Sequence, residues 1–336
     1  MSRVLKDQES TVVRILILAF LTVAIHAGRP AEAGWTITQL TDNSTHDMWP
    51  AISGTNVVWY GWDGSDYAVY SNFAGKLANT NFTNLNFLGS AGGPAVSGTN
   101  VVWVSYDGHD SQITTNFAGQ LTHNNYNNYM AHMPDISGTN VVWVDWFQDS
   151  AGLGFDLNSN FAGRLTTNSG MSYDKTTAIS GTNVVWQAGG DGIHSNFGAY
   201  WGPGYYGRAD ISGENVAWTY GDAFTNFSGQ LTSGGNRMNA AISGTNVAWV
   251  EMGGTLETNF GGSVPGFNYY YYMGSMSDPD ISGMTIVWNG PDMSGEPDQE
   301  IYMATYTSEA VPAPGAVLLA GIGVGLAGWM RRRRAW

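Results

Sequence analysis

The sequence predicts an all-β fold, a seven-bladed β-propeller of four-stranded antiparallel blades. An eight-residue phrase of the form Ile-Ser-Gly-Thr-Asn-Val-Val-Trp recurs along the 336 residues, with successive copies 31 to 44 residues apart. A recurrence of this length indicates stacked supersecondary units, and four short strands per unit are typical of a propeller blade. The seven copies occupy residues 52–59, 96–103, 136–143, 179–186, 211–218, 242–249 and 281–288.

Each copy predicts a β-hairpin. In the first, one strand ends at Ser53, Gly54-Thr55 forms a two-residue turn, and Asn56 leads into the strand Val57–Trp59. Glycine suits the positive φ that the first central position of such a turn requires. The β-branched and aromatic residues that follow favour a strand. The repeat therefore begins with two antiparallel strands, here called a and b.

A second phrase supplies strands c and d. It pairs Asn-Phe with Ala-Gly or Ser-Gly, which is again turn chemistry between two strands. It occurs at residues 72–77, 116–121, 160–165 and 226–231, with degenerate copies at 196–198 and 259–261. No helical periodicity supports a leucine-rich, ankyrin or tetratricopeptide array. A β-sandwich is the structural alternative, although it does not require seven near-identical hairpins.

The two ends of the repeat array predict ring closure. The last repeat has a c strand at Glu300–Ala304 but no outer strand after it. The segment Gln39–Thr41 matches the outer strands Gln120–Thr122 and Gln230–Thr232. An N-terminal strand beside Glu300–Ala304 would satisfy two otherwise open edges. The predicted propeller therefore spans residues 34–306.

The repeat sequences PAISGTNVVW and PDISGTNVVW resemble TolB-type β-propeller repeats. The resemblance covers residues 35–306. The resemblance implies a scaffold for protein contact. It carries no catalytic residue to assign here.

The N-terminus predicts export. An apolar run at residues 15–27 follows Arg14, and Ala31-Glu32-Ala33 offers a small-x-small cleavage pattern before Gly34. This is the layout of a secretory signal peptide, here residues 1–33, cut by signal peptidase. A buried helix or a membrane anchor are the alternatives.

The C-terminus has a linker at 307–314, an apolar segment at 315–330 and then an arginine cluster, with the chain ending at residue 336. This layout resembles the PEP-CTERM sorting signal of exosortase-containing Gram-negative bacteria. The resemblance implies an inner-membrane-anchored precursor, removal of the tail by an exosortase-type enzyme, and delivery to the cell surface or extracellular matrix. The positive-inside rule would keep the arginines cytoplasmic. The residues of this signal are Val311, Pro312, Pro314, Arg331, Arg332, Arg333 and Arg334.

One residue departs from that signal. Ala313 stands where the family usually has Glu, which leaves the efficiency of processing open. A simple C-terminal membrane helix over 315–336 is the alternative.

The composition between the two ends limits the partners. Residues 34–310 hold five Lys or Arg against 24 Asp or Glu. Such a surface repels phosphate backbones and excludes nucleic acid as a partner. The chain has no cysteine, so closure and the core must provide stability without disulfides.

Strand order predicts which face binds a ligand. The short, constant a–b and c–d turns share one face, and the varied b–c and d–a connections share the other. Function usually resides on variable loops, and these are rich in aromatic and Asn residues that suit a glycan or a protein partner. Packing of loop against loop is the alternative. The candidate ligand-binding residues are Trp62, Tyr106, Tyr126, Tyr129, Trp146, Tyr200, Trp201, Tyr205 and Tyr270.

Acidic Asp-Gly turns recur in the b–c loops. Asp-Gly is the residue pair of a tight hairpin turn, and converging carboxylates could also bind Ca²⁺. The weak Ca²⁺ candidates are Asp63, Asp66, Asp107 and Asp110. No other cofactor is predicted.

No sequence motif indicates catalysis. The chain has no His-x-x-x-His, Gly-x-Ser-x-Gly, phosphate-loop or cysteine site. The sequence therefore predicts a non-enzymatic, exported propeller that binds a glycan or protein. The alternative is a carbohydrate-active hydrolase or lyase with acidic residues at the channel mouth. Paired carboxylates with perturbed pKa values would favour that enzyme.

Overall fold

The computed structural model describes residues 33–84, 92–123, 131–149, 152–166, 174–188, 192–202, 209–252, 254–267, 279–292 and 298–308. Contacts divide the chain into Trp35–Tyr306 and a second unit of Met1–Gly34 with Thr307–Trp336. The predicted signal peptide and the apolar segment 315–330 lie outside the described residues. Within the described ranges, no helix has the length and apolarity needed to cross a bilayer.

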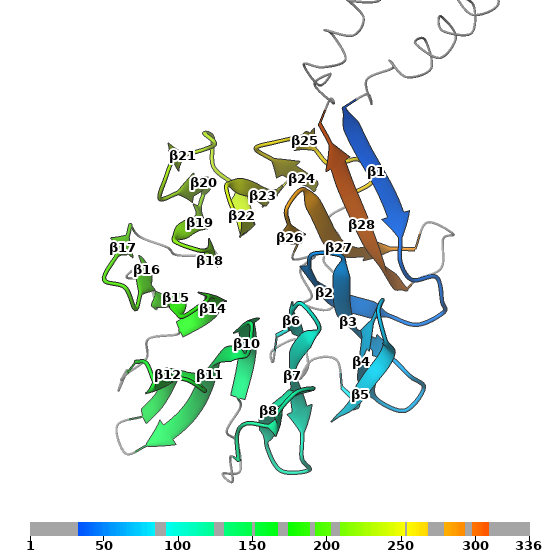
Figure 1. Ribbon diagram of the computed structural model, residues 1–336, viewed down its shortest axis with the longest axis vertical. Helices are drawn as coiled ribbons and strands as arrows, with labels where there is room; N and C mark the ends of the chain where they lie inside the picture. Colours follow the sequence, from blue (N-terminus) through cyan, green and yellow to red (C-terminus); the bar gives the residue numbers. More distant parts are fainter. Residues whose placement is uncertain are drawn as a thin grey trace, which may run out of the picture. The chain divides into compact units, whose positions relative to one another are not determined.

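The unit Trp35–Tyr306 consists of seven four-stranded antiparallel sheets (Figure 1). The a strands are β2 (Asp47–Ser53), β6 (Ala95–Ser97), β10 (Ala131–Ser137), β14 (Asp174–Ser180), β18 (Ala209–Ser212), β22 (Arg237–Ser243) and β26 (Asp280–Ser282). The b strands are β3 (Asn56–Trp62), β7 (Asn100–Tyr106), β11 (Asn140–Asp149), β15 (Asn183–Ala188), β19 (Asn215–Tyr220), β23 (Asn246–Glu251) and β27 (Thr285–Pro291).

The outer half of each blade is shorter in most repeats. The c strands are β4 (Tyr67–Ser71), β8 (Ser111–Thr115), β12 (Gly152–Ser159), β16 (Gly192–Ser195), β20 (Asp222–Thr225), β24 (Thr255–Thr258) and β28 (Gln299–Thr307). The d strands are β5 (Gly75–Phe82), β9 (Gly119–Gln120), β13 (Gly163–Arg164), β17 (Tyr200–Trp201), β21 (Gly229–Gln230), β25 (Gly262–Ser263) and β1 (Gly34–Gln39). Two-residue outer strands limit the exposed edge that each blade offers for unwanted pairing.

The ring closes as the sequence predicts. The seventh sheet has the order β1-β28-β27-β26, so the first strand of the chain completes the last blade. Leu40 N–H donates to the Ile301 carbonyl at 2.7 Å, and Ile301 N–H donates to Thr41 Oγ1 at 2.9 Å. The closing strand begins earlier than predicted, at Gly34, and its partner extends to Thr307. Strand β2 contacts both β26 and β27, which joins blade one to blade seven and excludes the sandwich alternative.

The turn phrase recurs because its residues join neighbouring blades. The turn glycine has φ between 63° and 68° in every copy, which favours Gly over any residue with a Cβ. Its N–H donates to the serine hydroxyl of the preceding blade at 2.8–2.9 Å at all seven junctions. At six junctions its carbonyl accepts from the preceding blade's Asn side chain. The last copy has Thr285 instead, whose hydroxyl hydrogen-bonds Thr305.

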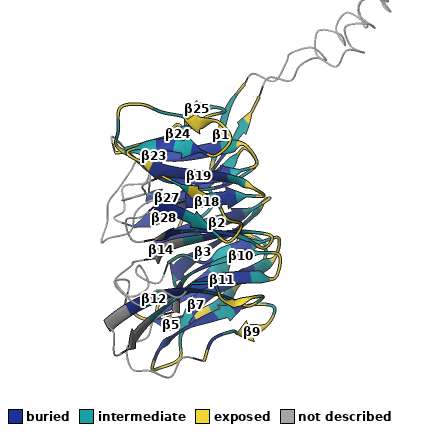
Figure 2. Ribbon diagram, turned by 90° about the vertical axis from the view of Figure 1, so that its left-hand side faces the viewer, coloured by how far each residue is buried: buried dark blue, intermediate teal, exposed yellow. Residues whose placement is uncertain are grey.

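The c–d turns share a face with the a–b turns. In blade one the Asn72 side chain accepts from Val57 N–H and donates to the Thr55 carbonyl, at 2.9 and 2.8 Å. Five other blades repeat this pair of bonds, through Asn116, Asn160, Asn196, Asn226 and Asn259. Figure 2 shows these exposed turns along one side of the propeller. The described b–c turns, such as 63–66 and 107–110, therefore lie at the opposite ends of the strands.

The repeated tryptophan supplies much of the core between blades. Six of the seven copies are at most 9% exposed, and Trp288 is only 1% exposed. Because the phrase repeats, the sequence predicts that all seven tryptophans occupy equivalent buried positions between blades, and this is wrong for Trp186, which is half-buried. The ring stacked on Trp186 is the His194 imidazole, whereas Trp218 and Trp288 stack on Phe224 and Tyr302.

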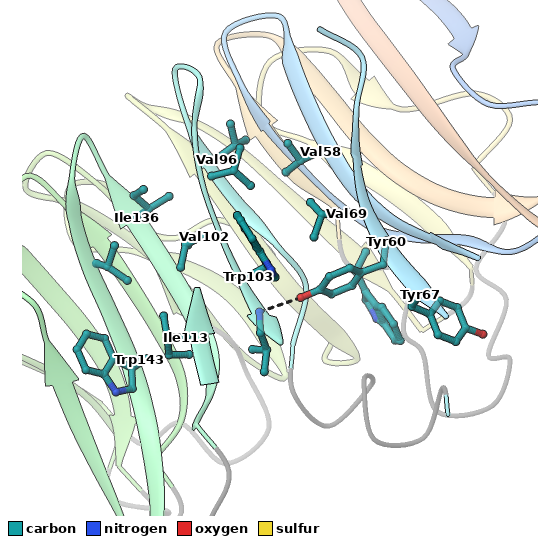
Figure 3. Packing of buried hydrophobic residues seen from close by; sticks show 14 of the residues in the cluster. Val58, Tyr60, Tyr67, Val69, Val96, Val102, Trp103, Ile113, Ile136 and Trp143 are labelled. Carbon is teal, nitrogen blue, oxygen red and sulfur yellow. Dashed lines mark hydrogen bonds between the residues drawn. The ribbon is translucent and has the colours of Figure 1, made fainter. Parts of the chain in front are cut away.

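Blade one is joined to blade two by a buried tyrosine (Figure 3). The fully buried Tyr60 hydroxyl accepts a hydrogen bond from Val104 N–H at 3.1 Å. Tyr60→Phe is expected to lower the free energy of unfolding by about 1–3 kcal/mol, because Val104 N–H is left buried without a partner. Chemical denaturation measures this effect. Tyr220→Phe, at a 46% exposed side chain, is the control and should change little. Equal stability of the two variants would contradict the role of this bond.

Strand β1 is also fastened to blade six. Trp35 Nε1 donates to the Gly261 carbonyl at 3.1 Å, and its ring packs on Phe260 and Tyr306. A Cβ on Gly261 would lie 2.8 Å from atoms of Trp35 and of Tyr306. The degenerate second phrase in blade six has glycine where the four full copies have alanine or serine, and Trp35 occupies the space that a Cβ would need.

Candidate functional site

A pocket lies where the ring closes, on the face of the variable connections. It has a volume of about 260 Å³. Its walls come from the segment that follows β1 and from strands β2, β3 and β4. The lining residues are Thr41, Asn43, Ser44, Thr45, Asp47, Trp59, Trp62 and Tyr70. The volume is below the roughly 300–1,000 Å³ of sites for drug-sized molecules, so the pocket is small.

Aromatic rings form one side of this pocket. Trp59 stacks on Tyr70 with ring centroids 6.2 Å apart, and Trp62 packs edge-on against Tyr67 at 5.1 Å. Trp59 is positioned by β3 and Tyr70 by β4, and these residues are directly paired in the sheet. Such faces are fixed by the strands before any ligand binds, which lowers the entropic cost of binding.

Polar groups form the other side. Asp47 accepts from Trp59 Nε1 at 3.0 Å and from the Asn43 side chain at 2.6 Å. The Asn43 backbone N–H donates to Glu300 Oε1 at 2.9 Å. Asn43 also accepts from Thr45 N–H at 2.8 Å. The loop that closes the ring is thus held in place by two carboxylates, one from blade one and one from blade seven.

Three carboxyl groups gather behind Asn43. Asp47, Asp298 and Glu300 are 3%, 6% and 0% exposed. Burial is the main cause that raises the pKa of Asp47 to about 6 and that of Glu300 to about 7; the acidic neighbours add a smaller contribution, and hydrogen bonds from Asn43 and Thr41 oppose it. Both oxygens of Asp298 and Glu300 Oε2 are buried without a hydrogen-bond partner among the described residues. No ion pair of the described residues involves Asp47, Asp298 or Glu300, and these three are named the seam carboxylates below.

The Asp47 carboxylate lies close to the backbone of Gly61, where a larger residue would not fit. A Cβ on Gly61 would lie 2.3 Å from Asp47 Oδ1. Gly61 pairs directly with Asp47 across the β2–β3 ladder. Position 61 therefore has glycine so that the carboxylate can reach the Trp59 indole.

The structure separates the predicted ligand-binding residues. Trp62 lines the pocket, whereas Tyr106 packs on Phe82 and Trp146 stacks on Phe155 in other blades. Trp201 packs against Trp218, and Tyr200 is 58% exposed beside His194. The remaining candidates lie outside the described residues: Tyr126, Tyr129, Tyr205 and Tyr270. Loop packing thus accounts for Tyr106, Trp146 and Trp201.

The proposed Ca²⁺ carboxylates serve their own turns. Asp63 accepts from the N–H groups of Ser65 and Asp66, and the paired Lys76 ammonium holds its pKa below the usual range. Asp107 accepts from the N–H groups of His109 and Asp110 in the same way. Asp66 accepts from Asn81 N–H, while the buried Asp110 carboxylate has no partner in the described part of the chain. In that part, no three His, Asp or Glu side chains are grouped to hold a metal ion.

Three further aspartates connect a strands around the ring. They are Asp135, Asp210 and Asp280. Each accepts one hydrogen bond from the backbone N–H of the residue that follows it and another from a backbone N–H in the a strand of the next blade, at 2.7–2.8 Å. These bonds join blades three to four, five to six and seven to one. The acidic residues nearest the ring axis therefore support the fold.

Sequence reasoning missed Asp47, Asp298 and Glu300. None belongs to the repeated phrases, because the seam combines the first and last segments of the array. One signal in the sequence could have found two of them. The acidic segment Asp298-Gln299-Glu300 differs from the other repeats, and it stands at the start of the c strand of the last blade. This segment comes close to Asp47 only because the ring closes.

Comparisons with known proteins add little. No protein-family model and no curated protein matches the chain. Among solved structures, the chain is similar to "YCF48 bound to D1 peptide", with 9% sequence identity and a TM-score of 0.46. The match covers 83% of this chain and 97% of that one. The assignment as a propeller rests on the seven sheets themselves.

Proposed function

We propose that this chain is an exported, non-enzymatic propeller that binds a glycan through the pocket at the ring closure. The observation that carries the proposal is the composition of that pocket: the aromatic side chains of Trp59, Trp62 and Tyr70 line it together with Asn43 and Thr45. Aromatic faces suit the C–H face of a sugar ring, and amide and hydroxyl groups suit its hydroxyls.

The two ends support the location. The signal-peptide layout at 1–33 and the PEP-CTERM-like layout at 311–336 favour an inner-membrane precursor whose propeller is passed to the cell surface or matrix. Similarity of the repeats to TolB-type propellers agrees with a binding scaffold rather than a catalyst. Mass spectrometry of membrane and surface fractions tests the location. A surface protein that still carries residues 315–336 would leave only the simple-anchor alternative.

The binding proposal is tested by one substitution. Trp62→Ala should reduce the affinity for any glycan found on an array by about tenfold or more, because the aromatic face of the pocket is lost. Tyr220→Ala removes an exposed aromatic from the same end of another blade and is the matched control. Unchanged binding by Trp62→Ala, with loss in the Tyr220 variant, would move the site to blade five.

One observation favours the enzyme alternative. Asp47 and Glu300 both have raised pKa values and share Asn43 as a hydrogen-bond donor. A protonated and an ionised carboxyl near a sugar ring are the requirements for general acid–base hydrolysis. Release of reducing ends from a bound oligosaccharide, lost in Asp47→Asn and in Glu300→Gln, would establish this activity in place of simple binding.

A further inference from the structure

Among the residues that the structure describes, no cationic side chain is paired with a seam carboxylate. Asp298 and Glu300 are more than nine-tenths buried, yet three of their four carboxylate oxygens have no hydrogen-bond partner among the described residues. The ion pairs of the described residues lie elsewhere, with Lys76, Arg164 and Arg237 as the cations. Buried carboxylates without partners are unfavourable unless a proton or a cation compensates them.

The cluster is electrostatically connected to the pocket. Asp47 lines the pocket, and the charge of Asp298 acts on both Asp47 and Glu300. Asn43, also in the lining, bonds to Asp47 and to Glu300. Negative charge behind a low-dielectric wall raises the local concentration of cations at the opening in front of it.

The aromatic wall favours the same sign of charge. Indole and phenol faces attract organic cations, by roughly 0.5–2 kcal/mol depending on solvent exposure. Trp59 is 8% exposed, and Trp62 and Tyr70 are half-buried, so a bound cation would be partly shielded from water. Aromatic faces combined with a buried acidic cluster form a site for an ammonium group carried on a compact, partly apolar body.

We propose that the seam pocket selects amino sugars over neutral sugars, with the ammonium group directed toward Asp47 and the sugar ring against Trp62. The inference rests on the proposed glycan binding and specifies its substrate class. A free metal ion matches the site less well, because the seam carboxylates, like every other set of three His, Asp or Glu side chains in the described part of the chain, are not placed to hold a metal ion together.

Three monosaccharides that differ at one carbon test the proposal. Binding of glucosamine, N-acetylglucosamine and glucose to the propeller is measured by titration calorimetry at pH 7. Glucosamine should bind at least about tenfold more tightly than the other two, and this preference should weaken as salt is added. The probes share one ring, so the comparison isolates the ammonium group.

Two substitutions that replace a carboxyl with an amide test whether the seam carboxylates cause this preference. Asp298→Asn and Glu300→Gln should each remove most of the preference for glucosamine. Asp298→Asn should also leave glucose binding unchanged, since the Asp298 side chain does not line the pocket. Asp298→Asn also removes an unpaired buried charge and should fold. Glu214→Gln, which removes one exposed charge from the opposite face, should bind like the original protein.

Each other outcome is decisive. Equal affinity for the three sugars would overturn the ammonium preference and leave the glycan-binding function standing. A preference for glucosamine that survives both substitutions would overturn its assignment to the seam carboxylates. If none of the three sugars binds, the inference is wrong. The glycan array then tests the proposed function separately.

Discussion

Trp288→Ala is expected to lower the free energy of unfolding by about 3–5 kcal/mol, the usual cost of truncating a large buried aromatic. Trp288 is 1% exposed, stacks on Tyr302 with centroids 5.8 Å apart and meets Phe267 edge-on at 6.0 Å. Its removal leaves a cavity in the blade that β1 closes. Chemical denaturation followed by fluorescence gives the difference.

Trp186→Ala is the matched control for this substitution. It removes the same side chain at the equivalent position of blade four, where the indole is half-buried and stacks on an imidazole. The loss should be clearly smaller than for Trp288. A loss in Trp288→Ala that does not exceed that of the control would show that burial of these tryptophans does not determine blade stability.

Asp210→Ala is expected to become progressively more stable relative to the original protein as pH rises from about 4 to about 8. Burial, followed by the charge of Asp280 and then that of Asp135, raises the pKa of Asp210 to about 8, although two backbone N–H bonds oppose this. In the unfolded chain the carboxyl loses its proton near pH 4. The stability that this proton contributes is thus fully present below about pH 4 and is lost as pH rises to about 8.

The size of this pH effect is on the order of a few kcal/mol, because each unit of pKa shift corresponds to about 1.4 kcal/mol. Alanine is acceptable at this position because four other blades carry it there: Ala51, Ala95, Ala178 and Ala241. Denaturation midpoints at several pH values measure the difference. Glu214→Ala, at an exposed turn, should show no such trend. A constant difference across this range would mean that Asp210 is ionised throughout.

The repeats alone were enough to predict the fold from the sequence, and the structure shows why. Ser53, Gly54 and Asn56 recur because they make the bonds between blades, so the pattern that counted seven blades is also the pattern that joins them. Closure was predictable because the unpaired c strand of blade seven and the surplus N-terminal strand are complementary.

The candidate site was predictable only in part. Trp62 was named from its loop, but its partners Asp47 and Tyr70 occupy regular strands and carry no mark of function. Tyr106 ends its b strand as Trp62 does, yet it packs on Phe82 of the neighbouring blade and does not line the pocket. Which aromatic residues remain available to a ligand depends on side-chain packing that a single sequence does not encode locally.

The most direct test of the account is an NMR titration of the tryptophan indole N–H signals with the sugar that binds. The Trp59 indole donates to Asp47 inside the pocket, and Trp62 lines it, whereas Trp146 and Trp201 pack in other blades. The account predicts that the Trp59 and Trp62 signals, assigned by Phe substitution, shift with saturation while those of Trp146 and Trp201 stay in place. Shifts confined to Trp146 or Trp201 would contradict it.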